Sequence, residues 1–379
     1  MRERNVLPDE QGVVYLEHGL AGRVGTGAYR HSVSARATLM AQRNVAVVRA
    51  LGGLGDVLCA VPALKRLRHA LPTARISYIG MPQVAGVVAR YPRLVDRFVE
   101  FPGFPGVVEA PFKPERLDDF LTAQRAGARY DLALQMHGSG SVTNVFTALL
   151  GARKMAGYYL PGLWQPEGVF EVFPDQLPEL ERWRHLMDLL GYCGGEDALD
   201  LPLTVEDHQD LQAAAPDLSR GYAVLHAGAS DPRRRWGTAE FARVGTLLAR
   251  QGLEVVLTGT ASEVPIVDAV ADAIDAPVRN LCGKTSLGAA AALIAGAQIV
   301  VTNDTGTSHM AAALGTPSVV IFIASDPARW APIDRQRHRV VGKGVPDPLF
   351  GQANPVVAPS HPSFAEVAEG IEDIMGVTA

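Results

Sequence analysis

Two stretches of the sequence place reactive side chains directly after apolar runs. The first, residues 52–56 (GGLGD), follows the apolar run 44–50. Its carboxylate has two interpretations: Asp56 caps the N-terminus of the next helix, or it is a general base presented into a cleft on a glycine turn. The loop does not match the dinucleotide fingerprint, because Leu58 stands where a third glycine is required. A dehydrogenase of the Rossmann type is therefore disfavoured.

The second stretch, residues 301–317, joins a polar cluster to an alanine-rich helical pattern. Asp304, Thr305 and Ser308 are candidates for the N-cap, so several free backbone N–H groups should converge there. Aligned amides and the helix dipole favour an anion, although a plain capped turn has the same pattern. His309 follows in the first turn of the helix. It is either a core histidine whose hydrogen bonds are satisfied, or a hydrogen-bond donor to phosphate that faces a cleft.

Three further polar turns, each after a predicted strand and here called corners, lie between residues 226 and 286. Small residues in the first corner allow close approach of a ligand, and the arginines 233–235 beside it could bind phosphate in bidentate fashion. In the second corner, Glu263 either helps to start a helix or binds a ribose. Four polar corners at one edge of a sheet fit a nucleotide site better than any one of them alone. The candidate donor-binding residues of these three corners are Gly228, Ala229, Ser230, Arg234, Glu263 and Thr285.

Apolar runs alternate with amphipathic patterns along most of the chain, which predicts an α/β fold with two doubly wound parallel sheets and a ligand cleft between them. The expected domains are residues 44–205 and 206–345, preceded by an extension (1–43) and followed by a segment (346–379) whose helix packs back on the body. The proline-rich segment 158–178 interrupts the alternation. Strands are expected at 44–50, 75–79, 97–101, 130–135, 222–226, 254–258, 298–302 and 318–323, and helices at 56–69, 84–90, 116–127, 142–150, 180–190, 238–251, 264–274, 286–295, after 304, and at 363–375.

The composition describes an ordinary globular protein of 379 residues, with 47% hydrophobic and 20% charged residues. A net charge of −5 argues against bulk nucleic-acid binding. Three cysteines without paired spacing fit a reducing compartment and neither a disulfide framework nor a zinc site. The N-terminus lacks the apolar core of a signal peptide, and no run has the length and apolarity of a membrane helix, so a cytoplasmic location is expected. No metal-ligand spacing, Walker loop or Gly-x-Ser-x-Gly elbow occurs.

Taken in order over roughly residues 44–335, the corners resemble glycosyltransferase family 9, the ADP-heptose:lipopolysaccharide heptosyltransferases. The most specific motifs are residues 55–58 (GDVL) with 62–64 (PAL), Arg234-x-Trp236, and residues 304–309 (DTGTSH). The resemblance implies the GT-B fold, two facing Rossmann-like domains, with the acceptor held mainly by the first domain and the nucleotide sugar by the second.

The resemblance also implies a role for each candidate residue. Asp56 would be the catalytic base, and Gly53 and Gly55 would belong to the acceptor-side loop. Arg234 stands where the family often has a lysine on the phosphate, which keeps the charge and changes the geometry. Gly228 and Ala229 replace hydroxyl-bearing residues of some members, so that Ser230 or backbone amides would take their part. The remaining assignments are Asp304, Thr305, Gly306 and His309 around the donor diphosphate, Glu263 on the ribose, and Thr285 beside the adenine.

The predicted function is inverting, metal-independent transfer of a sugar, most simply heptose from ADP-heptose, to a saccharide acceptor such as the lipopolysaccharide core. No cofactor and no nucleic-acid partner are expected; contact with the inner face of the membrane is compatible with this function. Two alternatives are a nucleotide-sugar epimerase with the same fold and a non-catalytic nucleotide-sugar-binding protein. The acceptor, the transferred sugar, the roles of residues 1–43 and 158–178, and the oligomeric state are left open.

Overall fold

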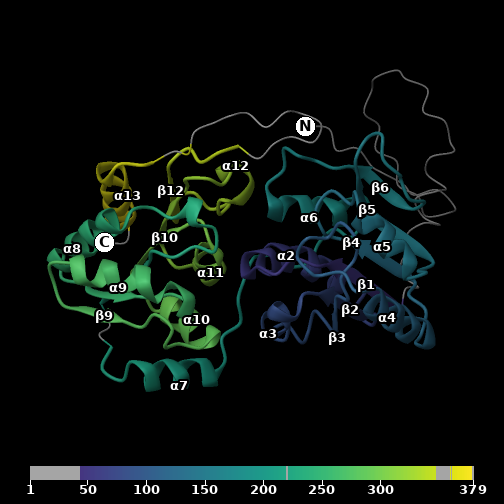
Figure 1. Ribbon diagram of the computed structural model, residues 1–379, viewed down its shortest axis with the longest axis horizontal. Helices are drawn as coiled ribbons and strands as arrows, with labels where there is room; N and C mark the ends of the chain where they lie inside the picture. The colour runs from purple at the N-terminus through teal and green to yellow at the C-terminus, as the bar shows by residue number, and fades with distance from the viewer. Residues whose placement is uncertain (1–42, 219–220, 347–358, 360, 378–379) are drawn as a thin grey trace, which may run out of the picture. The chain divides into compact units, whose positions relative to one another are not determined.

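The computed structural model describes residues 43–218, 221–346, 359 and 361–377 and contains two six-stranded parallel sheets (Figure 1). Residues 1–42 of the expected extension and residues 347–358, 360 and 378–379 of the segment 346–379 lie outside the described residues. In spatial order the first sheet consists of β3 (Arg97–Glu100), β2 (Arg75–Gly80), β1 (Asn44–Arg49), β4 (Leu132–Gln135), β5 (Lys154–Tyr159) and β6 (Val169–Val172). The second consists of β12 (His338–Val341), β11 (Ser318–Ile321), β10 (Ile299–Asn303), β7 (Tyr222–His226), β8 (Glu254–Leu257) and β9 (Val278–Asn280).

The two sheets have the same strand order, and in each the order reverses beside the first strand. In the first sheet β1 lies between β2 and β4, with Val48 opposite Gln135. In the second sheet β7 lies between β8 and β10, with His226 opposite Thr302. Connections leave such neighbouring strands in opposite directions, which opens a crevice at the carboxyl ends of the strands. The fold therefore provides two crevices for ligands.

Helices cover both faces of each sheet, which explains why the central strands are almost continuously apolar. In the first sheet, α4 and α5 enclose a core around Val48, Ala133 and Phe146, and α2 and α6 lie on the opposite side (Figure 1). In the second sheet, α8, α9 and the C-terminal helix α13 enclose the core around Leu225 and Ile321. The helices are α2 (Leu54–Ala70), α3 (Ala85–Val88), α4 (Pro114–Ala126), α5 (Thr143–Leu149), α6 (Glu179–Leu189), α7 (Val205–Ala214), α8 (Thr238–Arg250), α9 (Val264–Ala273), α10 (Leu287–Ala295), α11 (Gly306–Leu314), α12 (Pro327–Trp330) and α13 (Phe364–Val377), with 3-10 turns at η1 (Pro82–Val84), η2 (Pro232–Arg234) and η3 (Ala261–Glu263).

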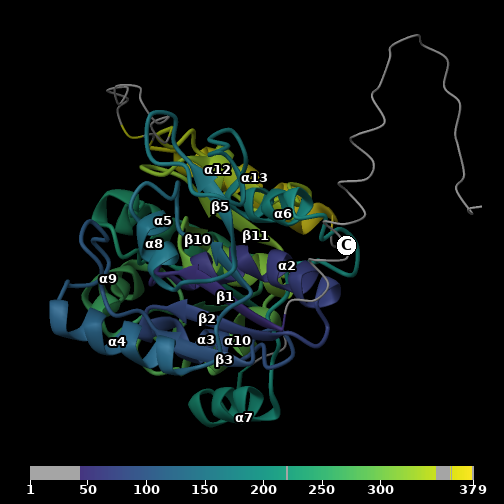
Figure 2. The same ribbon diagram turned by 90° about the vertical axis from the view of Figure 1, so that its right-hand side faces the viewer.

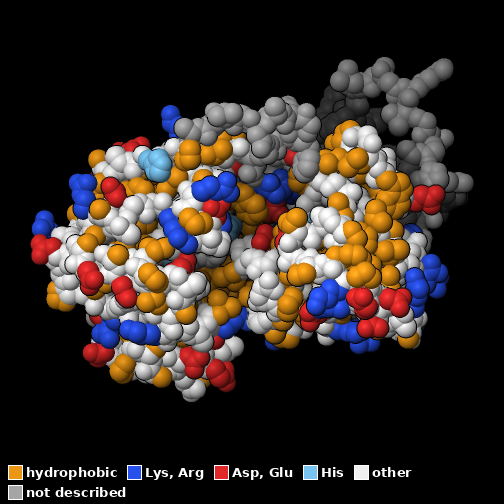
Figure 3. Space-filling model, in the orientation of Figure 1, with side chains coloured by type: hydrophobic (Ala, Val, Ile, Leu, Met, Phe, Trp, Pro, Cys, Tyr) orange, Lys and Arg blue, Asp and Glu red, His pale blue; other side chains and the backbone are white. Residues whose placement is uncertain are grey.

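The expected α/β fold class is confirmed, and the differences concern short elements that the sequence pattern did not predict. The segment 158–178 is not a featureless loop, because it contains the end of β5 and the edge strand β6, of which no residue is fully buried. Strands β9 and β12 are only three and four residues long and contain polar residues, so they lack the apolar run that marks the central strands. Basic and acidic side chains are interspersed on the face seen in Figure 3, in keeping with the small net charge.

Helix α7, which the sequence pattern also missed, lies against α10 (Figures 1 and 2). A capping box starts it, since Thr204 Oγ1 accepts from the Asp207 N–H and the Asp207 carboxylate accepts from the Thr204 N–H. Asp207 also accepts two hydrogen bonds from Arg90, at 2.6 and 2.7 Å. These bonds lower the pKa of the Asp207 carboxyl to about 2. A single carboxylate thus joins α7 to the segment that follows α3.

Gly288 in α10 is the contact point for this ion pair, and we predict that Gly288→Ala destabilises the protein. The new Cβ atom would overlap Asp207 Oδ1 and lie 2.6 Å from Arg90 Nη2, so overpacking should lower the free energy of unfolding by roughly 1–3 kcal/mol. Urea denaturation measures the change. The control is Gly86→Ala in α3, where no atom lies within 4 Å of the added Cβ and a gain of about 0.4–1 kcal/mol is expected. Equal stability of Gly288→Ala and the wild type would contradict the close contact of Gly288 with the Arg90–Asp207 ion pair.

Candidate active site

A cleft of about 1210 Å³ lies at the carboxyl ends of strands from both sheets. It brings together twelve of the thirteen predicted site residues, with Gly228 as the exception. It also contains residues that the sequence reasoning did not select, among them Glu109, His137, Glu179 and Arg329. The predicted residues that line the cleft are Gly53, Gly55, Asp56, Ala229, Ser230, Arg234, Glu263, Thr285, Asp304, Thr305, Gly306 and His309.

Asp56 caps its helix and also faces the cleft, so its position is compatible with both interpretations. It is the third residue of α2, and its Oδ2 accepts a hydrogen bond of 3.2 Å from the Gly53 N–H, so it does cap the helix. Its side chain is nevertheless 21% exposed and lines the cleft. Burial raises the pKa of the Asp56 carboxyl above its usual value, against the opposing effect of Arg49. A raised pKa makes the carboxylate a stronger base than a solvated aspartate.

Arg49, the last residue of β1, holds the backbone around Asp56 in place. The side chain is completely buried. Its Nε donates to the Asp56 carbonyl at 2.8 Å, its Nη1 to the Met136 carbonyl at 2.7 Å and its Nη2 to Glu179 Oε1 at 3.1 Å. Its closest approach to the Asp56 carboxylate is 3.8 Å, which is longer than a hydrogen bond. Arg49 therefore acts on this carboxylate through charge alone.

Glu179, the first residue of α6, is the buried counterion of Arg49. It also accepts hydrogen bonds from Arg182 and from Trp183 Nε1, the latter at 2.9 Å. Arg329 of α12, which lies between β11 and β12 of the second sheet, is 3.4 Å from Oε2. Burial by itself raises the pKa of the Glu179 carboxyl, but the three arginines and the Trp183 bond lower it to about 2. Glu179 is therefore ionised at neutral pH.

Arg234 joins two corners on the side of the second sheet. Its Nη2 donates to Ser230 Oγ at 2.9 Å and its Nη1 to the Asp304 carbonyl at 3.2 Å. Asp304 is buried, and its carboxylate lies 3.9 Å from Arg234 Nη1. Thr305 is the N-cap of α11, with Oγ1 accepting from the Thr307 N–H at 3.2 Å. The cation and the start of the helix thus face one cleft, an arrangement suited to an anion.

Asn303, the last residue of β10, is a second buried polar residue that sequence reasoning did not select as a site residue. Its Nδ2 donates to the carbonyls of Ala227 and Gly228 at 2.9 and 3.1 Å, and its Oδ1 accepts from the Trp236 N–H at 3.0 Å. Asn303 therefore ties the corner after β7 to the corner after β10 at the crevice of the second sheet. A polar residue that ends a buried strand was the signal available in the sequence.

Glu263 likewise caps a turn and lines the cleft. Its Oε2 accepts from the Thr260 N–H at 2.8 Å and from Thr260 Oγ1 at 2.9 Å, which caps the turn η3. Its Oε1 lies 3.9 Å from His226 Nε2, and the residue lines the cleft. A Cβ atom on Gly228 would overlap this Oε1. Gly228 thus contributes by leaving room for the Glu263 carboxylate, although it does not line the cleft.

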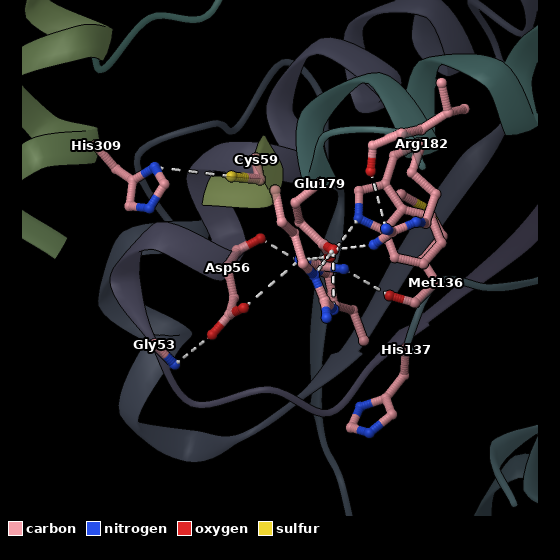
Figure 4. Close-up of polar contacts among 12 residues, drawn as sticks. Gly53, Asp56, Cys59, Met136, His137, Glu179, Arg182 and His309 are labelled. Atoms are coloured by element: carbon pink, nitrogen blue, oxygen red, sulfur yellow. Dashed lines mark hydrogen bonds and ion pairs between the residues drawn. The ribbon is translucent and has the colours of Figure 1, made fainter. Parts of the chain in front are cut away.

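His309 of α11 contacts α2 from the opposite side of the cleft (Figure 4). Its Nδ1 lies 3.8 Å from Cys59 Sγ, and its ring meets Trp330 edge to face. Burial lowers the pKa of the imidazole, so the ring is neutral and can donate one hydrogen bond. A Cβ atom on Gly55 would overlap the His309 ring. The glycine is required here because the two helices approach closely.

Among the described residues, no group of three or more histidine, cysteine, aspartate or glutamate side chains is arranged to hold a metal ion. Helices long and apolar enough to cross a membrane are likewise not found in the part of the chain that the structure describes.

Comparison with known proteins supports the resemblance seen in the sequence. The family model described as glycosyltransferase family 9 (heptosyltransferase) matches residues 122–355, which is more than half of the chain. The chain belongs to glycosyltransferase family 9. The two alternatives, an epimerase and a non-catalytic binding protein, gain no support from these comparisons.

Relatives of this family 9 protein are heptosyltransferases. Lipooligosaccharide heptosyltransferase 2 of Haemophilus influenzae is 35% identical over 106 residues, which is 27% of this chain and 31% of that protein. The match therefore spans about a third of that relative. Lipopolysaccharide heptosyltransferase 1 of Escherichia coli is 27% identical over 289 residues, 72% of this chain and 86% of that protein. The solved E. coli heptosyltransferase WaaC with ADP has a TM-score of 0.62 at 23% identity, covering 87% of this chain and 99% of that chain. This likeness confirms the expected GT-B fold.

The contact between Gly55 and His309 can be tested by a double-mutant cycle. We predict that Gly55→Ala lowers the free energy of unfolding by roughly 1–3 kcal/mol, because the added methyl group overlaps the His309 ring. In a His309→Ala background this cost should disappear. Urea denaturation of the four proteins measures the coupling. Gly52→Ala is the control, since its Cβ would meet only the flexible end of Gln83, at 3.1 Å. A cost that persists without His309 would contradict the proposed contact.

Proposed function

We propose that this family 9 protein transfers a sugar, most simply heptose, from an ADP-linked donor to a saccharide acceptor such as the lipopolysaccharide core, with inversion and without a metal ion. The observation that carries the proposal is that the Asp56 carboxylate and the Arg234–α11 corner line one cleft from opposite sheets. One supplies a base and the other a site for an anion. The names of the relatives, and the ADP in the WaaC structure, support heptose and ADP.

The donor diphosphate is proposed to lie between Arg234 and the N-terminus of α11. Arg234 already has an ordered position, because Ser230 and the Asp304 carbonyl accept its hydrogen bonds. The neighbouring Asp304 carboxylate would repel a phosphate, so its role would be to orient Arg234 and the backbone or to hold the sugar. Glu263, which lines the same cleft, would accept hydrogen bonds from ribose hydroxyl groups.

Transfer would begin with the acceptor hydroxyl beside Asp56. The hydroxyl oxygen attacks the anomeric carbon as its proton passes to Asp56, and the bond from that carbon to the phosphate oxygen breaks. ADP leaves from the face opposite to the attack, which inverts the configuration. General-base catalysis contributes typically ~10²–10⁴-fold to such a step. Arg234 and the amides that start α11 face the oxygen where negative charge develops, so they favour the transition state over the ground state.

Glu109 and His137 are proposed to bind acceptor hydroxyl groups. Both line the cleft, and their side chains belong to the segments around the first sheet. Burial lowers the pKa of His137 to about 4, so the imidazole is neutral at physiological pH. Its Nε2 lies 3.8 Å from Glu109 Oε1, too long for a direct hydrogen bond. A neutral imidazole and a carboxylate at this spacing suit an uncharged hydroxyl.

A lipopolysaccharide acceptor would place the protein at the inner face of the membrane in the cytoplasm.

Replacement of Asp56 tests the catalytic step. Asp56→Asn should reduce transfer of heptose from ADP-heptose by about 10²-fold or more, because the amide cannot accept the proton. The affinity for ADP, measured by calorimetry, should not change. Transfer is measured as ADP release in the presence of heptose-deficient lipopolysaccharide. Retained turnover would remove Asp56 from the role of base.

Replacement of Arg234 tests the diphosphate site separately. Arg234→Ala should weaken binding of both ADP and ADP-heptose by roughly ten-fold or more, since a hydrogen bond to a charged group contributes about 1.5–3 kcal/mol. His309→Ala should act in the same direction. Arg233→Ala is the matched control, because this neighbouring side chain is 79% exposed and pairs with Asp231. ADP affinities unchanged in both Arg234→Ala and His309→Ala would rule out this phosphate site.

A further inference from the structure

Glu179 occupies a position between the proposed base and the opposite half of the cleft. It contacts Arg49, the cation nearest to Asp56, and it also contacts Arg329 of α12. Its burial is almost complete, at 2% exposed, although it lines the cleft with Asp56. Burying a carboxylate among three arginines is costly unless each charge is paired. The arrangement therefore suggests a purpose beyond packing.

The consequence of this pairing is seen in the hydrogen bonds of Arg49. The Nε and both Nη atoms donate to the Asp56 carbonyl, the Met136 carbonyl and Glu179, whereas the Asp56 carboxylate lies 3.8 Å away. Without Glu179, Nη2 would lose its acceptor, and the nearest other carboxylate oxygen is Asp56 Oδ1, at 3.8 Å. An arginine bonded directly to Asp56 would stabilise the carboxylate and block its lone pairs.

We propose that Glu179 is a positioning residue for sugar transfer: by holding the Arg49 guanidinium, it leaves the Asp56 carboxylate open to the acceptor hydroxyl. This inference rests on the proposed role of Asp56 as the base. Glu179 also contacts Arg329. The protonation of Asp56 therefore depends as well on α12, which belongs to the donor side of the cleft.

Among the described residues, charged and titratable groups from five elements lie around Asp56. Arg49 of β1 and Glu179 of α6 are ionised. Burial raises the pKa of Cys59 on α2 and of Tyr78 on β2, so both stay protonated, and burial keeps His309 of α11 neutral. Burial raises the pKa of the Asp56 carboxyl most strongly, and of the two ionised neighbours Arg49 lowers this pKa whereas Glu179 raises it.

The experiment compares Glu179→Gln with the wild type in the pH dependence of transfer from ADP-heptose to heptose-deficient lipopolysaccharide. The amide removes the negative charge of Glu179 at nearly constant shape, so the acidic limb of the pH profile of kcat should move to lower pH. The value of kcat at neutral pH should fall by about ten-fold. KM for ADP-heptose should stay within about two-fold of the wild type, because Glu179 acts through the base and not through the donor. Glu179→Asp, which keeps the charge, should restore the position of the limb.

Glu181→Gln is the matched control on the same helix. Glu181 pairs with Arg184 at i,i+3, as Glu179 pairs with Arg182, but its side chain is 35% exposed and does not line the cleft. The control should leave the pH profile unchanged. An unshifted limb in folded Glu179→Gln, or an equal shift in Glu181→Gln, would overturn the proposal.

If Glu179→Gln does not fold, Arg329→Gln replaces it in the experiment, and the acidic limb is then expected to shift in the opposite direction. Loss of this cation leaves more of the Glu179 charge uncompensated, so the acidic limb should move to higher pH. A limb that is unchanged or moves to lower pH would overturn the proposal. Failure of the proposed function gives a different result, because Asp56→Asn would then retain turnover whatever the behaviour of the Glu179 variants.

Discussion

The ion pair between Arg49 and Glu179 is the interaction on which the geometry of the cleft depends. Both side chains are buried, and breaking a buried ion pair by removing one partner typically costs about 3–5 kcal/mol. Arg49 joins the end of β1 to the end of β4 through the Met136 carbonyl, and to α2 through the Asp56 carbonyl. Glu179 adds α6. One guanidinium therefore fixes the relative positions of four elements around the carboxylate of Asp56.

The second sheet solves the same problem with a neutral side chain. Its strand order repeats that of the first sheet, and Asn303 joins the corners on the two sides of its crevice. An amide suits this place because it satisfies backbone groups without adding charge. The charge of the crevice is then left to Arg234, which is partly exposed and faces the cleft. The cleft thus has a buried, paired cation on the side of the first sheet and a partly exposed one on the side of the second.

Much of the fold, and twelve of the residues that line the cleft, were predictable from local patterns. Strand β1, helix α2 and the corner at Asp304 were predictable, because each depends on residues close in sequence. Strands β9 and β12 were not, since short polar strands are defined by their neighbours in the sheet. Glu179 lies 130 positions from Arg49, and its sequence context is only that of an acidic residue at the start of a helix. Its role arises from the pairing, which no local pattern encodes.

The contact between Cys59 and His309 spans 250 positions of the chain, and this has a consequence for biosynthesis. All strands of the first sheet lie within residues 44–172 and all strands of the second within 222–341, so each sheet can fold from its own segment. Domains generally fold as units during synthesis, beginning at the N-terminus. The first half would then leave the ribosome already folded. At that stage α2 would lack its contact with His309, and Glu179 would lack its contact with Arg329. The cleft needs residues of both sheets, so it would form only after the second half has folded.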